Sequence, residues 1–237
     1  MTGSKQGRTK TRTPRSPTIG TENESSLHRA LKFQYAAPGT TETARAGYIC
    51  DALGPKGEAI EIQTGSFGVL KTKIPALAKA GKVRLIYPVI VNKTIELYDT
   101  KGTLLSCRKS PRKGTIWDIF RELIYAPVLV KLPRLTIEIV LVDAIERRLD
   151  DGKGSWRRKG ISIEDRILTA CRERIVLKKN VDWQKFLPLI GEFTSKTLAA
   201  AAHIRPDLAR KTLYVLEKAG FVKKLKKQGR SWLYRRL

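Results

Sequence analysis

Acidic and amide side chains in two neighbouring segments of the sequence could together bind a metal ion. Asp51 lies in GYICDAL, near the end of an apolar run, and Glu61 and Gln63 alternate along AIEIQTGS. Alternate residues of a strand project to one face of a sheet, so Glu61 and Gln63 are expected to share a face. Two carboxylates and an amide oxygen are a hard-oxygen ligand set suited to Mg²⁺ or Mn²⁺. Such an ion would activate a water molecule and stabilise the charge that develops on a phosphate.

The elements predicted around these residues are a helix, two strands, a helix and a third strand. The first helix begins near Asn23 and ends before Pro38, because proline and glycine follow there. The strands cover residues 44–53 and 58–63, on either side of a turn rich in glycine and proline. Helical spacing then extends over residues 67–80. The continuous apolar run over residues 83–91 is typical of a central strand that is covered on both faces.

The chain continues with shorter and more basic segments. A hairpin is predicted over residues 94–107 and an amphipathic helix over residues 115–125, with the basic loop 108–113 between them. A buried strand is predicted over residues 135–142. Residues 147–160 combine arginine and lysine with glycine, which favours a flexible basic loop that leads to a strand near residues 174–177.

The pattern around Asp51 resembles the PD-(D/E)XK nuclease superfamily, which has the restriction-endonuclease-like fold. The signature of that family is an aspartate that ends one strand and a Glu-x-Lys on the next, with a helix before and after. Asp51 and Glu61-x-Gln63 match it within the predicted element order over residues 22–91. The resemblance implies an α/β domain with a mixed sheet and flanking helices, in which Asp51 and Glu61 hold the metal. The catalytic residues that it implies are Glu24, Asp51, Glu61 and Gln63.

The sequence departs from the family at two positions. Gln63 stands where lysine is usual, and Cys50 stands where a proline usually precedes the aspartate. The missing lysine removes the simplest positive charge for orienting the attacking water. Lys71 or Lys73, on the following predicted helix, could supply that charge from another direction.

Other roles for these residues stay open. His28, one helical turn after Glu24, could assist a metal site. Asp51 could instead cap the turn while Glu61 forms a salt bridge with a lysine at the sheet edge, in which case the domain is inactive. A polar pair on a covered sheet face needs a compensating partner, and this favours the metal site.

Residues 181–237 are predicted to form a winged helix-turn-helix. Thr194 or Ser195 caps a first helix, a tight turn follows, and Pro206 opens a second helix that Gly220 ends. A basic hairpin completes the order of elements, which resembles the winged-helix family. The resemblance implies that the second helix enters the major groove of DNA and that the hairpin, or wing, contacts the backbone.

The basic residues of this segment follow the predicted recognition helix and wing. From Arg205 to the end of the sequence there are eleven basic residues and two acidic ones, a balance suited to phosphate contact. A solvated charged face, or a winged helix that contacts protein, is the alternative. The side chains predicted to contact nucleic acid are Arg210, Lys211, Tyr214, Lys218, Lys226, Lys227 and Arg230.

The charge of the whole chain favours a polyanionic partner. The 237 residues contain 47 Lys and Arg against 22 Asp and Glu, a formal charge of +25. Duplex DNA is the predicted partner, with RNA or an anionic membrane surface as alternatives. No apolar run reaches transmembrane length and no secretory signal is found, so the predicted location is cytoplasmic, with the nucleoid, and no membrane partner is expected. A homodimer is compatible with the sequence.

The sequence therefore predicts a disordered basic arm over residues 1–20, a nuclease-like α/β domain over residues 21–180 and a winged helix-turn-helix over residues 181–237. The predicted function is hydrolysis of phosphodiester bonds in DNA by an endonuclease that depends on Mg²⁺ or Mn²⁺. The alternative is a non-catalytic DNA-binding regulator or assembly factor with an inactive nuclease-like domain. No phosphate-binding loop of the GxxxxGK type occurs, so no ATP-driven function is predicted.

Overall fold

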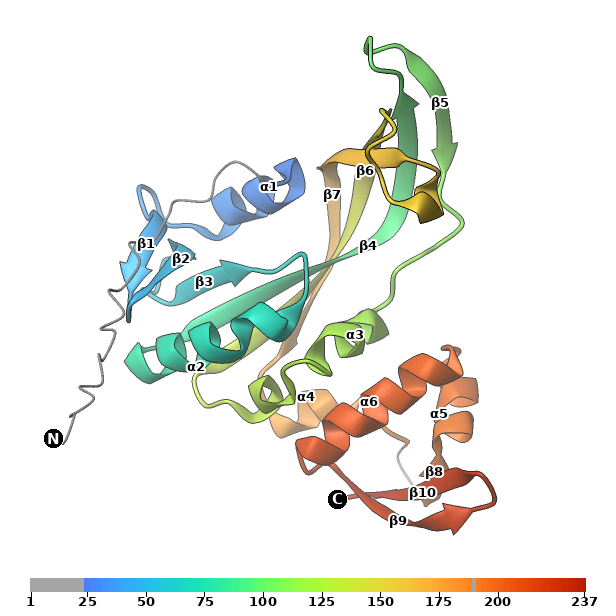
Figure 1. Cartoon of the computed structure of the whole chain (residues 1–237). Coiled ribbons are helices and arrows are strands. Elements are labelled where there is room, and N and C mark those ends of the chain that lie inside the picture. The colour runs from blue at the N-terminus through green and yellow to red at the C-terminus, as the bar shows by residue number, and fades with distance from the viewer. Residues whose placement is uncertain (1–23, 189–190) are drawn as a thin grey trace, which may run out of the picture.

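The structure is a computed structural model, and it describes residues 24–188 and 191–237. The basic arm predicted over residues 1–20 lies outside the described residues. A mixed seven-stranded sheet forms the centre of the described chain (Figure 1). The strands are β1 (Thr41–Arg45), β2 (Tyr48–Leu53), β3 (Ala59–Ile62), β4 (Val83–Tyr98), β5 (Leu104–Lys109), β6 (Leu135–Asp150) and β7 (Ile161–Leu177).

The topology of the sheet is mixed because one long strand has parallel neighbours. The strand order is β1-β2-β3-β4-β6-β7, and β5 pairs with the second half of β4. β4 runs parallel to β3 and to β6, and the remaining neighbours are antiparallel. The predicted α/β class, a mixed sheet with flanking helices, is confirmed.

Helix α1 (Ser26–Tyr35) packs on one face of the sheet. The hydroxyl of Ser25 caps the helix by accepting the backbone N–H of His28 at 3.3 Å. The predicted start near Asn23 lies outside the described residues. The apolar side chains of the helix recur at every fourth position and close a core with the strands beneath them. The buried residues of this core are Leu27, Leu31, Tyr35, Ala52, Ile60, Ile62, Ile86, Val140, Val142 and Ala144.

Helices α2 (Leu70–Ala80) and α3 (Ile119–Leu123) pack on the opposite face. A single helical turn precedes each of them, so the helices predicted over residues 67–80 and 115–125 are confirmed in position. Both faces of β4 are therefore covered along its first half, as its apolar sequence requires: Leu85 joins the core under α2, and Ile86 joins the core under α1.

Two strand predictions were wrong in their boundaries. Residues 44–53 do not form one strand, because Ala46 and Gly47 have φ of 50° and 76° and turn the chain between β1 and β2. The central strand predicted over residues 83–91 continues to Tyr98, where it pairs with β5. The longer strand carries the sheet beyond the region that the helices cover.

The basic loop predicted over residues 147–160 was wrong in its bounds, because the structure confines it to residues 151–160. β6 continues through Asp150 and β7 begins at Ile161, so the two strands form one long antiparallel hairpin. Buried Glu146 explains why charged residues are tolerated in this part of the sheet. Its carboxylate accepts from Lys93, Arg148 and Arg166 at 3.1, 2.6 and 3.2 Å, so the buried charge is fully paired.

The remaining chain forms a smaller unit that packs on α3. Its three-stranded antiparallel sheet has the order β8-β10-β9. α6 begins at Pro206 as predicted, and Thr194 caps α5 by accepting the backbone N–H of Thr197 at 3.2 Å. The short helix predicted from Trp183 begins earlier, at Asn180. The elements are α4 (Asn180–Gln184), β8 (Glu192–Thr194), α5 (Ser195–Ala201), α6 (Pro206–Lys218), β9 (Val222–Gln228) and β10 (Ser231–Arg236).

Aromatic residues join this unit to the sheet domain. Phe120 of α3 lies 4.9 Å from Phe186 and 6.4 Å from Trp183, measured between ring centroids. The apolar side chains of α6 belong to the same continuous core as those of α2 and α3. One flank of α6 is therefore buried against the sheet domain.

Candidate active site

The register of β2 and β3 sets the two predicted metal ligands on adjoining strands. Ala52 lies opposite Ile60 and Leu53 opposite Ala59, so continuing the antiparallel register by one residue places Asp51 opposite Glu61. Ile60 and Ile62 belong to the core under α1, whereas Glu61 contacts α2 on the other face. The predicted alternation along β3 is confirmed for these residues.

Asp51 is held as a carboxylate by two donors. Its Oδ2 accepts the backbone N–H of Ile62 at 2.7 Å and lies 3.1 Å from Nε2 of His28. Burial acts to raise the pKa of Asp51, but the hydrogen bond and charge of His28 and the N–H of Ile62 outweigh it. The pKa therefore lies below its usual range, and Asp51 is ionised at neutral pH.

Glu61 is buried more deeply and carries an unused oxygen. One carboxylate oxygen bonds the ammonium of Lys73 on α2, and the other, Oε2, is buried without a hydrogen-bond partner among the described residues. Burial and the charge of Asp51 raise the pKa of Glu61 to about 7, against the opposing effect of Lys73. An orphaned carboxylate oxygen beside a second carboxylate is a position that a cation can fill.

Among the described residues, Glu24 is connected to Asp51 through His28, which contacts both carboxylates. Its carboxylate forms an ion pair with Lys32 at 2.8 Å and lies 3.5 Å from Nδ1 of His28, whose other nitrogen contacts Asp51. Gln63 lies one residue beyond the end of β3, and its side-chain N–H donates to the carbonyl of Ser66 at 3.0 Å. The structure therefore joins Glu24, His28 and Asp51 in one chain of contacts and turns the Gln63 amide toward a loop.

Lys73 is the cation that contacts Glu61. It approaches Glu61 from α2, one of the two helical positions considered from the sequence, whereas the structure gives Lys71 no such contact. Within the described residues no group of three or more His, Cys, Asp or Glu side chains is close enough to share one ion. The fit is to Mg²⁺, which proteins commonly hold with one or two carboxylates while substrate phosphate and water complete the shell. Asp51 and Glu61 would be its protein ligands.

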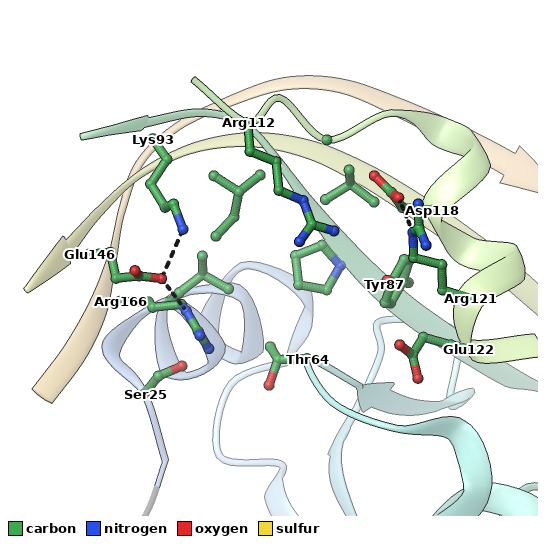
Figure 2. A pocket seen from close by; sticks show the side chains of 15 residues that line it. Ser25, Thr64, Tyr87, Lys93, Arg112, Asp118, Arg121, Glu122, Glu146 and Arg166 are labelled. Carbon is green, nitrogen blue, oxygen red and sulfur yellow. Dashed lines mark hydrogen bonds and ion pairs between the residues drawn. The ribbon is translucent and has the colours of Figure 1, made fainter. Parts of the chain in front are cut away.

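A pocket of about 290 Å³ is lined by neighbours in sequence of the candidate residues, but not by Asp51, Glu61 or Lys73 themselves (Figure 2). It is bounded by Ser25 and Thr64, the residues next to Glu24 and Gln63 in the sequence. Apolar side chains of β4 form one wall, and charged side chains stand on two sides. The charged residues of its lining are Lys93, Arg112, Asp118, Arg121, Glu122, Glu146 and Arg166.

Arg112 differs from the other cations of this pocket because its side chain forms no ion pair with any residue that the structure describes, whereas Lys93 and Arg166 pair with Glu146. Figure 2 shows the guanidinium group extending into the middle of the pocket. The loop that carries it is anchored where Gly114 donates to the carbonyl of Ile90 at 2.9 Å, and a Cβ on Gly114 would lie 2.6 Å from that oxygen. The pocket thus presents a free cation to an anionic ligand.

The predicted nucleic-acid contacts of α6 fall into two groups. Arg210, Tyr214 and Lys218 are exposed and follow one another at intervals of four residues, so they form one line along the helix. Lys211 is half-buried on the flank toward α3, where its charge acts on Glu122. On the wing, Lys226, Lys227 and Arg230 are exposed.

Comparison with known proteins gives the class of the sheet domain. The chain belongs to the family described as "Domain of unknown function (DUF8091)", whose model matches residues 25–178. That range contains Asp51, Glu61, Lys73 and the whole pocket lining.

A relative matches about two thirds of the chain. An "Uncharacterized protein" of Treponema pallidum (strain Nichols) is 35% identical over 152 residues, which cover 64% of this chain and 61% of the relative. The chain thus spans less than two thirds of that protein's length. No solved structure matches. In the part of the chain that the structure describes, none of the helices is long and apolar enough to span a membrane.

Proposed function

We propose that this protein is a metal-dependent DNA endonuclease of the PD-(D/E)XK type, with Asp51 and Glu61 as its metal ligands. The observation that carries the proposal is the pairing of these two carboxylates on adjoining strands, one with an orphaned buried oxygen and a lysine beside it. The helix, strands, helix and strand around them, α1 to β4, occur in the order that the family resemblance implies.

Each residue of the candidate site has a distinct role in this proposal. A divalent ion, when bound, supplies the positive charge that stabilises a phosphate as its phosphodiester bond breaks. Lys73 holds a proton and a positive charge beside Glu61 and takes the role of the usual strand lysine. His28 fixes the orientation of Asp51 through their 3.1 Å contact, and Glu24 orients His28 from its other nitrogen.

The pocket and the smaller unit supply the grip on DNA in this proposal. Arg112 offers its free guanidinium to a phosphate in the pocket. β8, α5, α6 and the β9–β10 hairpin follow the winged-helix order, and Arg210, Tyr214 and Lys218 give α6 an exposed contact line. Because the opposite flank of α6 packs on α3, the DNA path is restricted to that line and the wing.

A second candidate function rests on one observation. Asp51 and Glu61 already have protein partners, His28 and Lys73, and such contacts are also what a non-catalytic DNA-binding protein would retain. In that case the sheet domain is a rigid platform for the DNA-binding surface.

A nuclease assay on the full-length protein separates the two functions. Plasmid, branched and single-stranded DNA are incubated with Mg²⁺ or Mn²⁺ and with wild type, Asp51→Ala, Glu61→Ala or Glu164→Ala, which changes an exposed carboxylate on β7. We expect cleavage by wild type and Glu164→Ala alone. Tight DNA binding with no cleavage by wild type under any of these conditions would favour the regulator.

A further inference from the structure

The hairpin of β6 and β7 ends in a folded loop, residues 151–160, which presents a tryptophan to solvent. The side chain of Trp156 is 83% exposed, more than any other large apolar side chain of the described residues. Exposing a ring of this size forgoes the free energy of burying it, so it calls for a partner. Isolated exposed apolar residues are common, and the argument therefore depends on how this one is held.

Close packing, positive φ angles and hydrogen bonds fix the backbone conformation of the loop. A Cβ on Gly154 would lie 1.8 Å from the carbonyl oxygen of Ile161, so no other residue fits there. Gly160 and Lys159 have φ of 81° and 53°, and the backbone N–H of Gly154 donates to Gly160 at 2.7 Å. Asp151 closes the base, because it accepts the N–H of Lys153 at 3.0 Å and the hydroxyl of Ser162 at 3.1 Å.

The charges around the ring identify the kind of partner. Lys153, Arg157 and Lys159 are exposed beside Trp156, and the guanidinium of Arg157 lies 5.8 Å from the ring centroid. Arg158 is the exception, since its Nε donates to the carbonyl of Ile161 at 3.1 Å and serves the fold of the loop. One rigid aromatic ring among free cations is complementary to a nucleic-acid strand, in which a base stacks on the ring and its flanking phosphates meet the cations.

We propose that Trp156 is a stacking wedge for an unpaired base of DNA. The inference rests on the proposed function, since it assumes that the chain binds DNA, and it adds a substrate class: DNA with a gap, branch or single strand. Continuous duplex would still bind through the α6 line and the wing, but it would offer the ring no exposed base.

The test is DNA binding by the full-length protein in EDTA, so that no cleavage occurs. Labelled duplexes with and without a single-stranded gap are titrated with wild type, Trp156→Ala, Trp156→Phe and Gly154→Ala. Phe33→Ala is the matched control, because Phe33 is an aromatic side chain on α1 with 66% exposure.

We expect Trp156→Ala and Gly154→Ala to weaken binding to gapped DNA by about tenfold, the size of one base–aromatic stack, with a smaller effect on continuous duplex. Trp156→Phe keeps most of the affinity, and Phe33→Ala is unchanged. Because Trp156 is exposed, its removal leaves the melting temperature unaltered, which excludes misfolding as the cause.

The possible failures are distinguishable. If wild type binds neither DNA, the proposed function fails. If wild type binds both and Trp156→Ala binds gapped DNA equally well, the wedge is wrong while DNA binding stands. Phosphatidylserine vesicles form the last arm: vesicle binding that Trp156→Ala abolishes, with DNA binding unchanged, would assign the loop to a membrane and overturn the inference.

Discussion

Lys73 of α2 and Glu61 of β3 form an ion pair on the face of the sheet that α2 covers. In the proposed function, this pair takes the place of the carboxylate–lysine contact that the nuclease family makes within the strand. Because Glu61 is only 4% exposed, the pair also neutralises a charge that would otherwise be costly to bury.

Replacing Lys73 tests whether this helix lysine serves in place of a lysine at position 63. Lys73→Ala leaves Glu61 buried without its cation, so we expect loss of cleavage and a stability loss of about 3 kcal/mol. Gln63→Lys in the Lys73→Ala protein returns a lysine to the strand and should restore part of the cleavage. Lys71→Ala, an exposed lysine of the same helix, is the control. Normal cleavage by Lys73→Ala would remove Lys73 from the site.

A second prediction concerns Arg112, whose guanidinium group is free in the pocket. Arg112→Ala should weaken binding of full-length protein to DNA several-fold and lower the slope of log affinity against log salt by about 1, the value for one phosphate contact. Arg108→Ala, at the end of β5 just before the loop that carries Arg112 and outside the pocket lining, should have a smaller effect. Equal effects of the two changes would show that only the charge of the loop matters.

The two groups of residues on α6 should differ in the same assay. Arg210→Ala and Lys218→Ala remove members of the exposed line, so each should lower affinity and the salt slope. Lys211 lies on the flank toward Glu122, and Lys211→Ala should therefore change DNA affinity less than either. If Lys211→Ala is the most damaging of the three, α6 meets DNA by a different flank.

Acid should weaken the far end of the sheet. Burial acts to raise the pKa of Glu146, but Arg148, Lys93 and Arg166 hold it at about 2, below the ordinary value in an unfolded chain, about 4.3. A lowered folded-state pKa means that the stabilisation is complete above about pH 4.5 and is lost as pH falls toward 2. Urea unfolding should thus show Glu146→Gln less stable than wild type by at most about 3 kcal/mol at pH 6, with the difference closing in that window. A difference that does not depend on pH would contradict this account.

The sequence predicts best those elements whose signals are local. The helix start at Pro206, the helix over residues 67–80 and the apolar first half of β4 were all placed correctly, and Thr194 is one of the two predicted caps of α5, since each signal depends on neighbours within a turn or a strand. The hairpin strand predicted over residues 94–98 is the far half of β4, whereas the far halves of β6 and β7 were missed. Their charges are paired across strands, as Lys93 and Glu146 are over 53 residues of sequence, and no local pattern reveals such a pair.

The candidate site divides in the same way. Spacing and alternation sufficed to place Asp51 and Glu61 on adjoining strands. Their side-chain partners come from helices on opposite faces of the sheet, His28 on α1 and Lys73 on α2, and this was not predicted. Gln63 was expected to point toward the two carboxylates, but a tight local turn satisfies its amide at Ser66. The partnership of Lys73 with Glu61 depends on how α2 lies over β3, which sequence spacing leaves open between Lys71 and Lys73.

The measurement that most directly tests the central claim is Mn²⁺ binding by the full-length protein on uncleavable phosphorothioate DNA, followed by electron paramagnetic resonance. We predict that wild type with DNA binds Mn²⁺ stoichiometrically, and that Asp51→Ala and Glu61→Ala lose this ion while they still bind DNA. Wild type that binds DNA without Mn²⁺, or Asp51→Ala that binds Mn²⁺ as wild type does, would contradict the account.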